Sequence, residues 1–116
     1  MVESEQLLRQ TYAAFNSRDI ETALAAMHPD VDWPNGWEGG REQGRDAVRE
    51  YWRRQFESID SRADPVGFAE DEQGRIVVVV HQVVHDSEGK LLADQQVEHV
   101  YTLRDGLVER MDIREG

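Results

Sequence analysis

The sequence predicts an α+β fold in which helices come first and an antiparallel sheet follows. In the first half, apolar residues recur every three or four positions, which is typical of helices that bury one side. In the second half, alternating and valine-rich stretches are separated by short turns that contain glycine, which is typical of β-hairpins. A run of helices before a run of hairpins indicates an α+β fold, because a parallel sheet needs helices between its strands.

Three helices are expected in the first half. Asp19 is a good N-cap for the second, and Pro29 ends it because the residue before a proline avoids helical angles. The expected helices run from Ser4 or Glu5 to about Asn16, from Ile20 to about Met27, and from about Arg45 to about Ile59. The residues expected to face inward are Leu8, Thr11, Tyr12 and Phe15 in the first helix, Ala23, Leu24 and Met27 in the second, and Val48, Trp52, Phe56 and Ile59 in the third.

Most of the remaining chain is predicted to form strands. A short strand is expected at 31–33, a loop at 34–40, and longer strands at about 63–69, 75–85, 91–103 and 107–114. Residues 76–80 are all valine or isoleucine, so both faces of that strand are apolar. Antiparallel sheets usually leave one face wet, so we expect a second copy of the chain to cover the outer face in a homodimer.

The last hairpin contains the most informative residue of the chain. Val97, His99, Tyr101 and Leu103 share one face because strand side chains alternate. That face is otherwise apolar, so the imidazole of His99 points toward a core or a pocket. It is therefore either a core histidine with hydrogen-bond partners or the polar centre of a ligand site.

Length and charge exclude several classes of protein. The 116 residues fit a single domain, 1–116. The net charge of −11 repels nucleic acid and anionic membrane surfaces, so neither is an expected partner. The chain has no cysteine, so neither a disulfide nor a thiolate site is possible. It has no signal-peptide pattern at its start and no apolar run of about 20 residues that could cross a bilayer, so we expect a cytoplasmic protein.

No cofactor and no metal site are expected. His81 and His85 have the H-x-x-x-H spacing of zinc ligands on a helix. On a strand this spacing separates them by about 13 Å, which is too far to share one ion. His81 faces the pocket if the turn at 87–90 pairs it with Val97, and a shift of one residue places it outside.

Four segments resemble the NTF2-like superfamily, within it the SnoaL-like and ketosteroid-isomerase-like group. They are Tyr12–Glu21 at the end of the first helix, His28–Trp33 at the first strand, Gly44–Trp52 at the third helix, and Val97–Ile113 in the last hairpin. Together they span nearly the whole chain in the right order. The resemblance implies a cone-shaped α+β barrel, with three N-terminal helices packed on a curved, mostly antiparallel sheet around a mostly apolar pocket. Members of this group are often homodimers.

The resemblance also assigns positions in the pocket. His99 matches the carboxyl group of the ketosteroid-isomerase oxyanion hole. The position of the general base falls at Trp33, one residue from Asp32, which alternation turns to the other face. The tyrosine donor falls at or beside Tyr12. This set argues against the isomerase reaction, because the base is replaced by an indole. Asp112 and Arg114 are expected to form an outer-face ion pair.

Two functions from different classes remain open. One is the binding of a small hydrophobic molecule. The other is a lyase, isomerase or cyclase reaction on a cyclic polyketide-, steroid- or terpenoid-like substrate, with His99 as acid and base, Tyr12 or Tyr101 as donor, and Asp32 orienting it. A purely structural dimerisation module is a third hypothesis, favoured if tryptophans fill the interior. The expected pocket residues are Tyr12, Phe15, Trp33, Trp37, Trp52, His81, His99, Tyr101, Met111 and Ile113, with Trp37 as a lid.

Overall fold

The computed structural model describes residues 2–115, which form three helices and one six-stranded sheet. The elements are α1 (Val2–Asn16), α2 (Ile20–Ala25), β1 (Met27–Pro34), β2 (Arg41–Gln43), α3 (Arg45–Ser58), β3 (Ile59–Glu70), β4 (Ile76–Asp86), β5 (Leu91–Arg104) and β6 (Leu107–Glu115). The strand order is β2-β1-β6-β5-β4-β3, and every neighbouring pair is antiparallel except β1 with β6. The predicted α+β class is confirmed.

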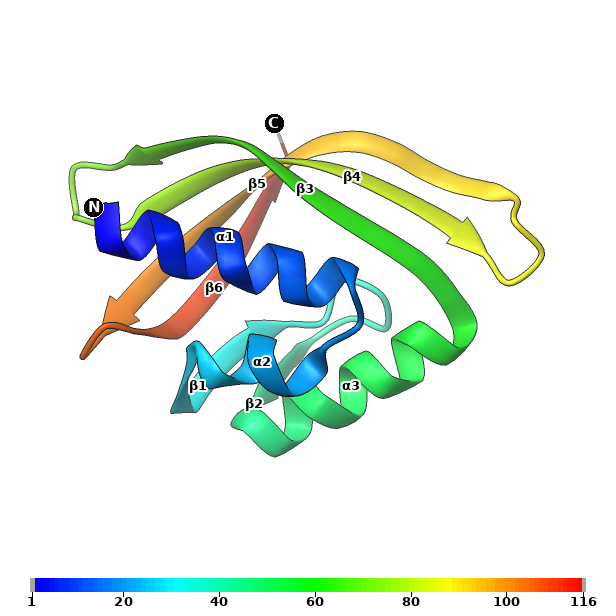
Figure 1. Cartoon of the computed structure of the whole chain (residues 1–116), viewed down its shortest axis with the longest axis horizontal. Coiled ribbons are helices and arrows are strands. Elements are labelled where there is room, and N and C mark those ends of the chain that lie inside the picture. The colour runs from blue at the N-terminus through cyan, green and yellow to red at the C-terminus, as the bar shows by residue number, and fades with distance from the viewer. Residues whose placement is uncertain (1, 116) are drawn as a thin grey trace.

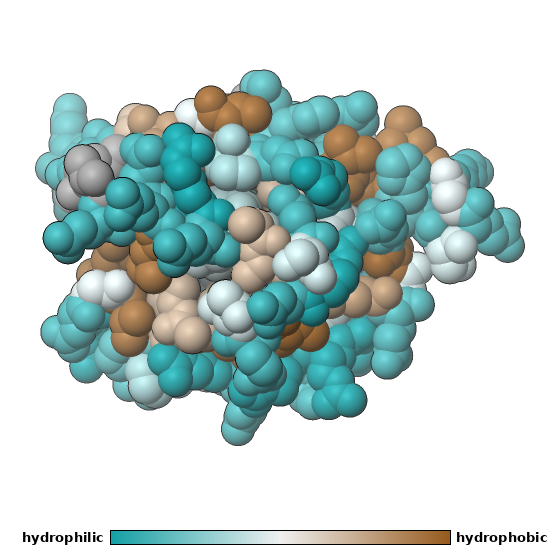
Figure 2. All heavy atoms as spheres, viewed as in Figure 1, coloured by the Kyte–Doolittle hydropathy of each residue, from teal (hydrophilic) through white to brown (hydrophobic). Residues whose placement is uncertain are grey.

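The sheet curves over the first helix. Figure 1 shows β3, β4 and β5 arching over α1, with α2, α3 and the short strands on the other side of that helix. The inner face of the arch and the buried stripe of α1 therefore enclose the interior between them. Figure 2 shows that the face seen in this view is mostly hydrophilic, with apolar surface in separate patches. No helix within residues 2–115 is long and apolar enough to span a membrane.

The interior is built from the side chains that the helical and strand patterns predict. In α1, Leu8, Thr11 and Tyr12 are buried and Phe15 is half-buried. In β4, Ile76, Val78 and Val80 are buried on the inner face, while Val77 and Val79 are half-buried on the outer face. The turn before β6 has positive φ at Asp105 and Gly106, as a tight hairpin turn requires.

Four elements differ from the sequence-based expectation, and one of them, the short strand β2, was not expected at all. The second helix ends at Ala25, so the buried Met27 begins β1 rather than ending a helix. β1 is longer than expected because it pairs in parallel with β6, and its register shifts between Met27 and Asp32, where Pro29 lies. β3 begins at Ile59, immediately after α3, because it pairs with the far end of β4. The three helices are not one N-terminal block, since β1 and β2 lie between α2 and α3.

Candidate functional site

A cavity of about 620 Å³ lies between the helices and the inner face of the sheet. It is lined from α1, β1, the loop that follows β1, β2, α3 and the strands β3 to β6. Every predicted pocket residue except His81 lines it, namely Tyr12, Phe15, Trp33, Trp37, Trp52, His99, Tyr101, Met111 and Ile113. The interior is therefore hollow, although three tryptophans contribute to its wall.

Three buried polar side chains form a hydrogen-bond chain in the cavity wall. The hydroxyl of Tyr101 donates to the hydroxyl of Tyr12 over 2.7 Å. The hydroxyl of Tyr12 lies 2.7 Å from Nδ1 of His99. Tyr12 comes from α1 and the other two from β5, so the chain joins the first helix to the sheet. All three residues are at least nine-tenths buried.

The three groups are neutral near pH 7, and burial favours the neutral form of each. Burial lowers the pKa of the His99 imidazole to about 4 and raises the pKa of both Tyr12 and Tyr101. With Tyr101 donating to Tyr12, the Tyr12 hydrogen is directed to Nδ1 of His99. The hydrogen of the neutral imidazole is then on Nε2.

The Nε2 group of His99 is available to a ligand. It makes no hydrogen bond to any residue in the range 2–115. Within the same range, every side-chain nitrogen or oxygen that is fully inaccessible to solvent has a hydrogen-bond partner. The unpaired Nε2 atom is therefore accessible from the cavity that His99 lines. His99 thus presents one N–H donor to whatever occupies the space.

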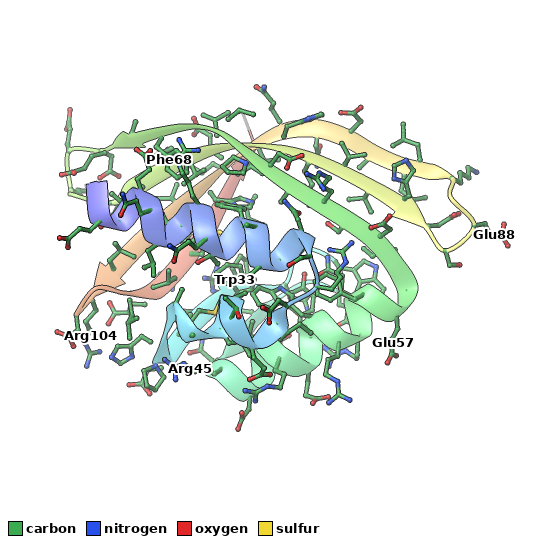
Figure 3. The ribbon with its side chains drawn as sticks, in the orientation of Figure 1. Trp33, Arg45, Glu57, Phe68, Glu88 and Arg104 are labelled. Atoms are coloured by element: carbon green, nitrogen blue, oxygen red, sulfur yellow. The ribbon has the colours of Figure 1, made fainter. Side chains whose placement is uncertain are left out.

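Aromatic rings form a rigid wall beside this donor. The Trp33 and Trp52 rings meet edge to face with centroids 5.5 Å apart, and Phe15 meets Trp52 in the same way at 5.5 Å. Trp33 also lies 6.3 Å from Tyr101. Figure 3 shows Trp33 in the interior, below α1. Edge-to-face packing of this kind keeps the rings in place and leaves an apolar surface for a ligand.

The loop after β1 borders the mouth of the cavity. Trp37 in this loop is 38 % exposed. Two other lining residues, Leu92 and Ile113, are exposed to a similar or greater degree. The buried Asn35 holds the loop, because its side-chain oxygen accepts hydrogen bonds from the backbone N–H of Trp37 and Glu38. Trp37 therefore lies at the mouth of the cavity, on a loop with internal hydrogen bonds.

A second, more open hollow of about 550 Å³ lies between α1 and β3. Its arginines already have acidic partners, since Arg9 pairs with Glu5 at 3.0 Å and Arg62 with Asp64 at 2.9 Å. The charged groups of this hollow are therefore already paired. The larger and less open cavity that contains His99 is the better candidate site.

The chain is similar to a known protein family. The family model of the SnoaL-like domain matches residues 8–111 of this chain. This chain belongs to the SnoaL-like domain family. An NTF2-like protein of unknown function from Burkholderia pseudomallei K96243 is 29 % identical, with a TM-score of 0.85 over 100 % of this chain and 92 % of that one.

Two further solved structures resemble this SnoaL-like domain. TerC, co-crystallised with polyporic acid, is 30 % identical, with a TM-score of 0.84 over 98 % of this chain and 92 % of TerC. A proposed polyketide cyclase from Xanthomonas campestris pv. campestris is 25 % identical, with a TM-score of 0.79 over 98 % of this chain and 90 % of that one. A search of curated proteins found no relative of this chain.

Asp32 does not orient His99 in this SnoaL-like domain. Its carboxylate pairs with Arg41 on one side and with Arg110 at 2.7 Å on the other. Burial raises its pKa, but hydrogen bonds from Arg41 and Gln43 outweigh that effect and hold the pKa below its usual value. The prediction of Asp32 as an orienting group is wrong because alternation turns Asp32 away from the face that Trp33 occupies.

His81 is also outside the pocket. The strand register pairs His81 with Gln96, and Val80 takes the position opposite Val97. The His81 side chain is 43 % exposed and lies 2.6 Å from Asp94 on the outer face. The prediction of His81 in the pocket is wrong by one residue of register.

The predicted ion pair between Asp112 and Arg114 has different partners. Asp112 pairs with Arg110 at 2.9 Å and with Arg41 at 3.2 Å, while Arg114 pairs with Glu98 at 3.1 Å. The charged groups do lie on the face opposite Met111, but Asp112 and Arg41 also border the cavity. Within residues 2–115, no group of three or more histidine or acidic side chains could hold a metal ion.

Several polar residues that line the cavity were not predicted from the sequence. Tyr51 and Gln55 extend the buried stripe of α3, at three- and four-residue steps from Val48 and Trp52. Burial raises the pKa of Tyr51 to about 12. A stripe read from apolar residues alone omits Gln55, whereas the helical spacing includes it. The other polar lining residues that were not predicted to face inward are Arg41, Ser61, Gln82, Gln95 and Asp112.

Proposed function

We propose that this SnoaL-like domain binds a small, ring-containing and mostly apolar molecule, with an oxygen of that molecule accepting a hydrogen bond from Nε2 of His99. The observation that carries the proposal is a buried, neutral imidazole whose free N–H opens into a cavity of about 620 Å³. That volume lies within the range of about 300–1,000 Å³ typical of small-molecule sites. The aromatic wall supplies apolar contact, and His99 supplies orientation.

The likeness to TerC supports the same class of ligand. TerC was co-crystallised with polyporic acid and is 30 % identical over nearly the whole chain. Polyporic acid is an aromatic hydroxyquinone, with flat rings for an apolar wall and oxygens that accept hydrogen bonds. Its chemistry matches a cavity that contains Trp33, Trp52 and the His99 donor.

Acid and base catalysis by His99 is the second candidate, on a cyclic polyketide-, steroid- or terpenoid-like substrate. The hydrogen-bond chain from Tyr101 through Tyr12 to His99 favours it, because the chain fixes the orientation of the imidazole and directs its Nε2 atom into the cavity. A pKa near 4 lies well below the working range of a general base at neutral pH. Binding therefore ranks ahead of catalysis, and Asp32 takes no part in either.

Titration with polyporic acid, followed by calorimetry, tests the proposal. His99→Asn keeps an amide near Nδ1 for Tyr12 but removes the donor at Nε2, so it is expected to weaken binding about tenfold. His99→Gln places an amide near Nε2 and is the matched variant, expected to retain most of the affinity. Equal affinity of all three proteins contradicts the role of His99, and absence of binding to the wild type contradicts the proposed ligand class.

The fate of the ligand separates the two candidates. Polyporic acid recovered unchanged by chromatography after long incubation favours binding. Conversion to a product that depends on His99 favours catalysis.

The proposed assembly is a cytoplasmic homodimer through the outer face of the sheet. Val77, Val79 and Val83 lie on that face of β4 and are half-buried in a single copy of the chain. Light scattering at micromolar concentration is expected to give twice the mass of the chain, and Val79→Asp is expected to give a monomer. A monomeric wild type contradicts the dimer.

A further inference from the structure

Two buried polar side chains of the cavity wall have no hydrogen-bond partner within residues 2–115. Gln55 is 7 % exposed and Ser61 is 1 % exposed, and both line the cavity. Neither side chain makes a hydrogen bond within the part of the chain that the structure describes. In that part, every side-chain nitrogen or oxygen that is fully inaccessible to solvent has a hydrogen-bond partner. The unpaired Gln55 amide and Ser61 hydroxyl are therefore accessible from the cavity that they line. Buried polar groups are nearly always satisfied, which leaves these two to a molecule inside the cavity.

The two side chains come from one junction of the fold. α3 ends at Ser58 and β3 begins at the next residue, so Gln55 and Ser61 lie on either side of a direct helix-to-strand connection. Two more amides continue this polar region along the sheet. Gln82 and Gln95 face each other on β4 and β5, and both line the cavity.

This polar region is well separated from His99. Gln95 and His99 lie on the same face of β5, four residues apart, which is about 13 Å along a strand. Val97 lies between them and is 3 % exposed. The cavity therefore has a polar group at each end and an apolar stretch in the middle.

The second polar end is uncharged. Among the described residues that line the cavity, the charged side chains are Arg41 and Asp112, which pair with each other at 3.2 Å. Gln55 and Ser61 offer amide N–H, amide oxygen and hydroxyl groups. Groups of this kind suit a hydroxyl, carbonyl or amide of a ligand and give a carboxylate or phosphate no opposing charge.

We infer that the ligand is an elongated molecule with a neutral hydrogen-bonding group at each end, one held by His99 and the other by Gln55 and Ser61. This inference rests on the proposed function and adds the chemistry of the far end of the ligand. A molecule with the first group alone leaves the Gln55 amide and the Ser61 hydroxyl to water, so the cavity discriminates against it.

Two rigid phenols test the inference by calorimetry. p-Phenylphenol has one hydroxyl, and p,p′-biphenol has a hydroxyl at each end of the same biphenyl. The wild type is expected to bind the diol about 3- to 10-fold more tightly than the monophenol, the effect of about one hydrogen bond. Gln55→Leu, which keeps the bulk of the side chain, is expected to abolish this preference, because it removes both the partner of the second hydroxyl and the amide that the monophenol leaves unpaired.

Further variants keep the test decisive. Ser61→Ala makes a smaller change at the same end and is expected to reduce the preference if Gln55→Leu does not fold. Glu57→Gln is the matched control on α3, because Figure 3 shows Glu57 directed away from the interior, and it is expected to retain the full preference.

The outcomes separate the inference from the proposed function. Equal wild-type affinity for the two phenols contradicts the inference alone, as does an equal loss of affinity for both in Gln55→Leu. If neither phenol binds, the proposed function fails together with the inference.

Discussion

The two faces of the sheet place similar side chains in opposite environments. His99 on the inner face lies 2.7 Å from the Tyr12 hydroxyl and is 8 % exposed. His81, on the neighbouring strand and the outer face, lies 2.6 Å from the Asp94 carboxylate, with 43 % of its side chain exposed. The two hydrogen bonds are similar in length, so exposure to water distinguishes the two histidines.

The difference indicates why the candidate site lies on the inner face. Inside, desolvation keeps His99 uncharged, and each unpaired polar atom there is costly. Outside, ion pairs such as Arg114 with Glu98 are screened by water and salt, so each contributes little stability. Polar groups on the inner face therefore need hydrogen-bond partners. Where the protein supplies none, water or a ligand does.

The largest contrast is expected between two adjacent residues of β5. Tyr101 faces inward and is 1 % exposed, while Thr102 faces outward and is half-buried. Tyr101→Ala is expected to lower the free energy of unfolding by about 4 kcal/mol, because it leaves a cavity in the core. Thr102→Ala is expected to lower it by less than about 1 kcal/mol. Urea denaturation of both variants checks this, and equal losses would show that the two faces do not differ.

The next effect concerns pH. Burial lowers the pKa of His99 from 6.5 to about 4, so its contribution to stability is fully present above pH 6.5. As the pH falls toward 4, the unfolded chain takes up a proton that the folded chain does not, and about 3 kcal/mol is lost.

His99→Asn isolates this part of the pH profile, since the amide does not titrate. The difference in unfolding free energy between wild type and variant is expected to change between pH 6.5 and 4 and to persist in about 1 M salt, because it arises from desolvation. A difference that stays constant with pH would refute the buried neutral state of His99.

A smaller loss is expected from the tyrosine between His99 and Tyr101. Tyr12→Phe leaves the Tyr101 hydroxyl and Nδ1 of His99 without a protein partner, which is expected to cost about 2 kcal/mol. Asp94→Asn on the outer face is the comparison, expected to cost less than about 0.5 kcal/mol. Thermal unfolding measures both, and a Tyr12→Phe variant as stable as wild type would contradict the hydrogen-bond chain.

The smallest effect is expected from an outer-face ion pair. Glu98→Gln removes the partner of Arg114, whose side chain is 51 % exposed. The unfolding free energy is expected to change by less than about 0.5 kcal/mol at low salt and by nothing measurable in about 1 M salt. The proposed dimer would bury this pair, so the measurement is made at a concentration at which light scattering gives the mass of one chain. A larger, salt-independent loss in the monomer would contradict the prediction.

Periodicity was sufficient to predict much of the fold and part of the site. The inner stripe of α1 and the alternation of Val97, His99 and Tyr101 were predicted because each is a local pattern of burial. The same alternation turned Asp32 away from Trp33, although its arginine partners come from β2 and β6 and were not predicted. Gln55 and Ser61 were not predicted, because a pattern of apolar residues does not include polar side chains, even where these line a cavity in the core.

The sequence by itself determined the α+β class, the three helices, the last hairpin and the inward direction of His99. All of these depend on spacing along the chain, at 3.6 residues per turn or two residues per strand repeat. Only the tertiary structure decided that Tyr12 and Tyr101 connect to His99, that His81 lies outside, and that Gln55 and Ser61 face the same cavity. Strand register and the packing of α1 on the sheet set these contacts, and one residue of register changes the face.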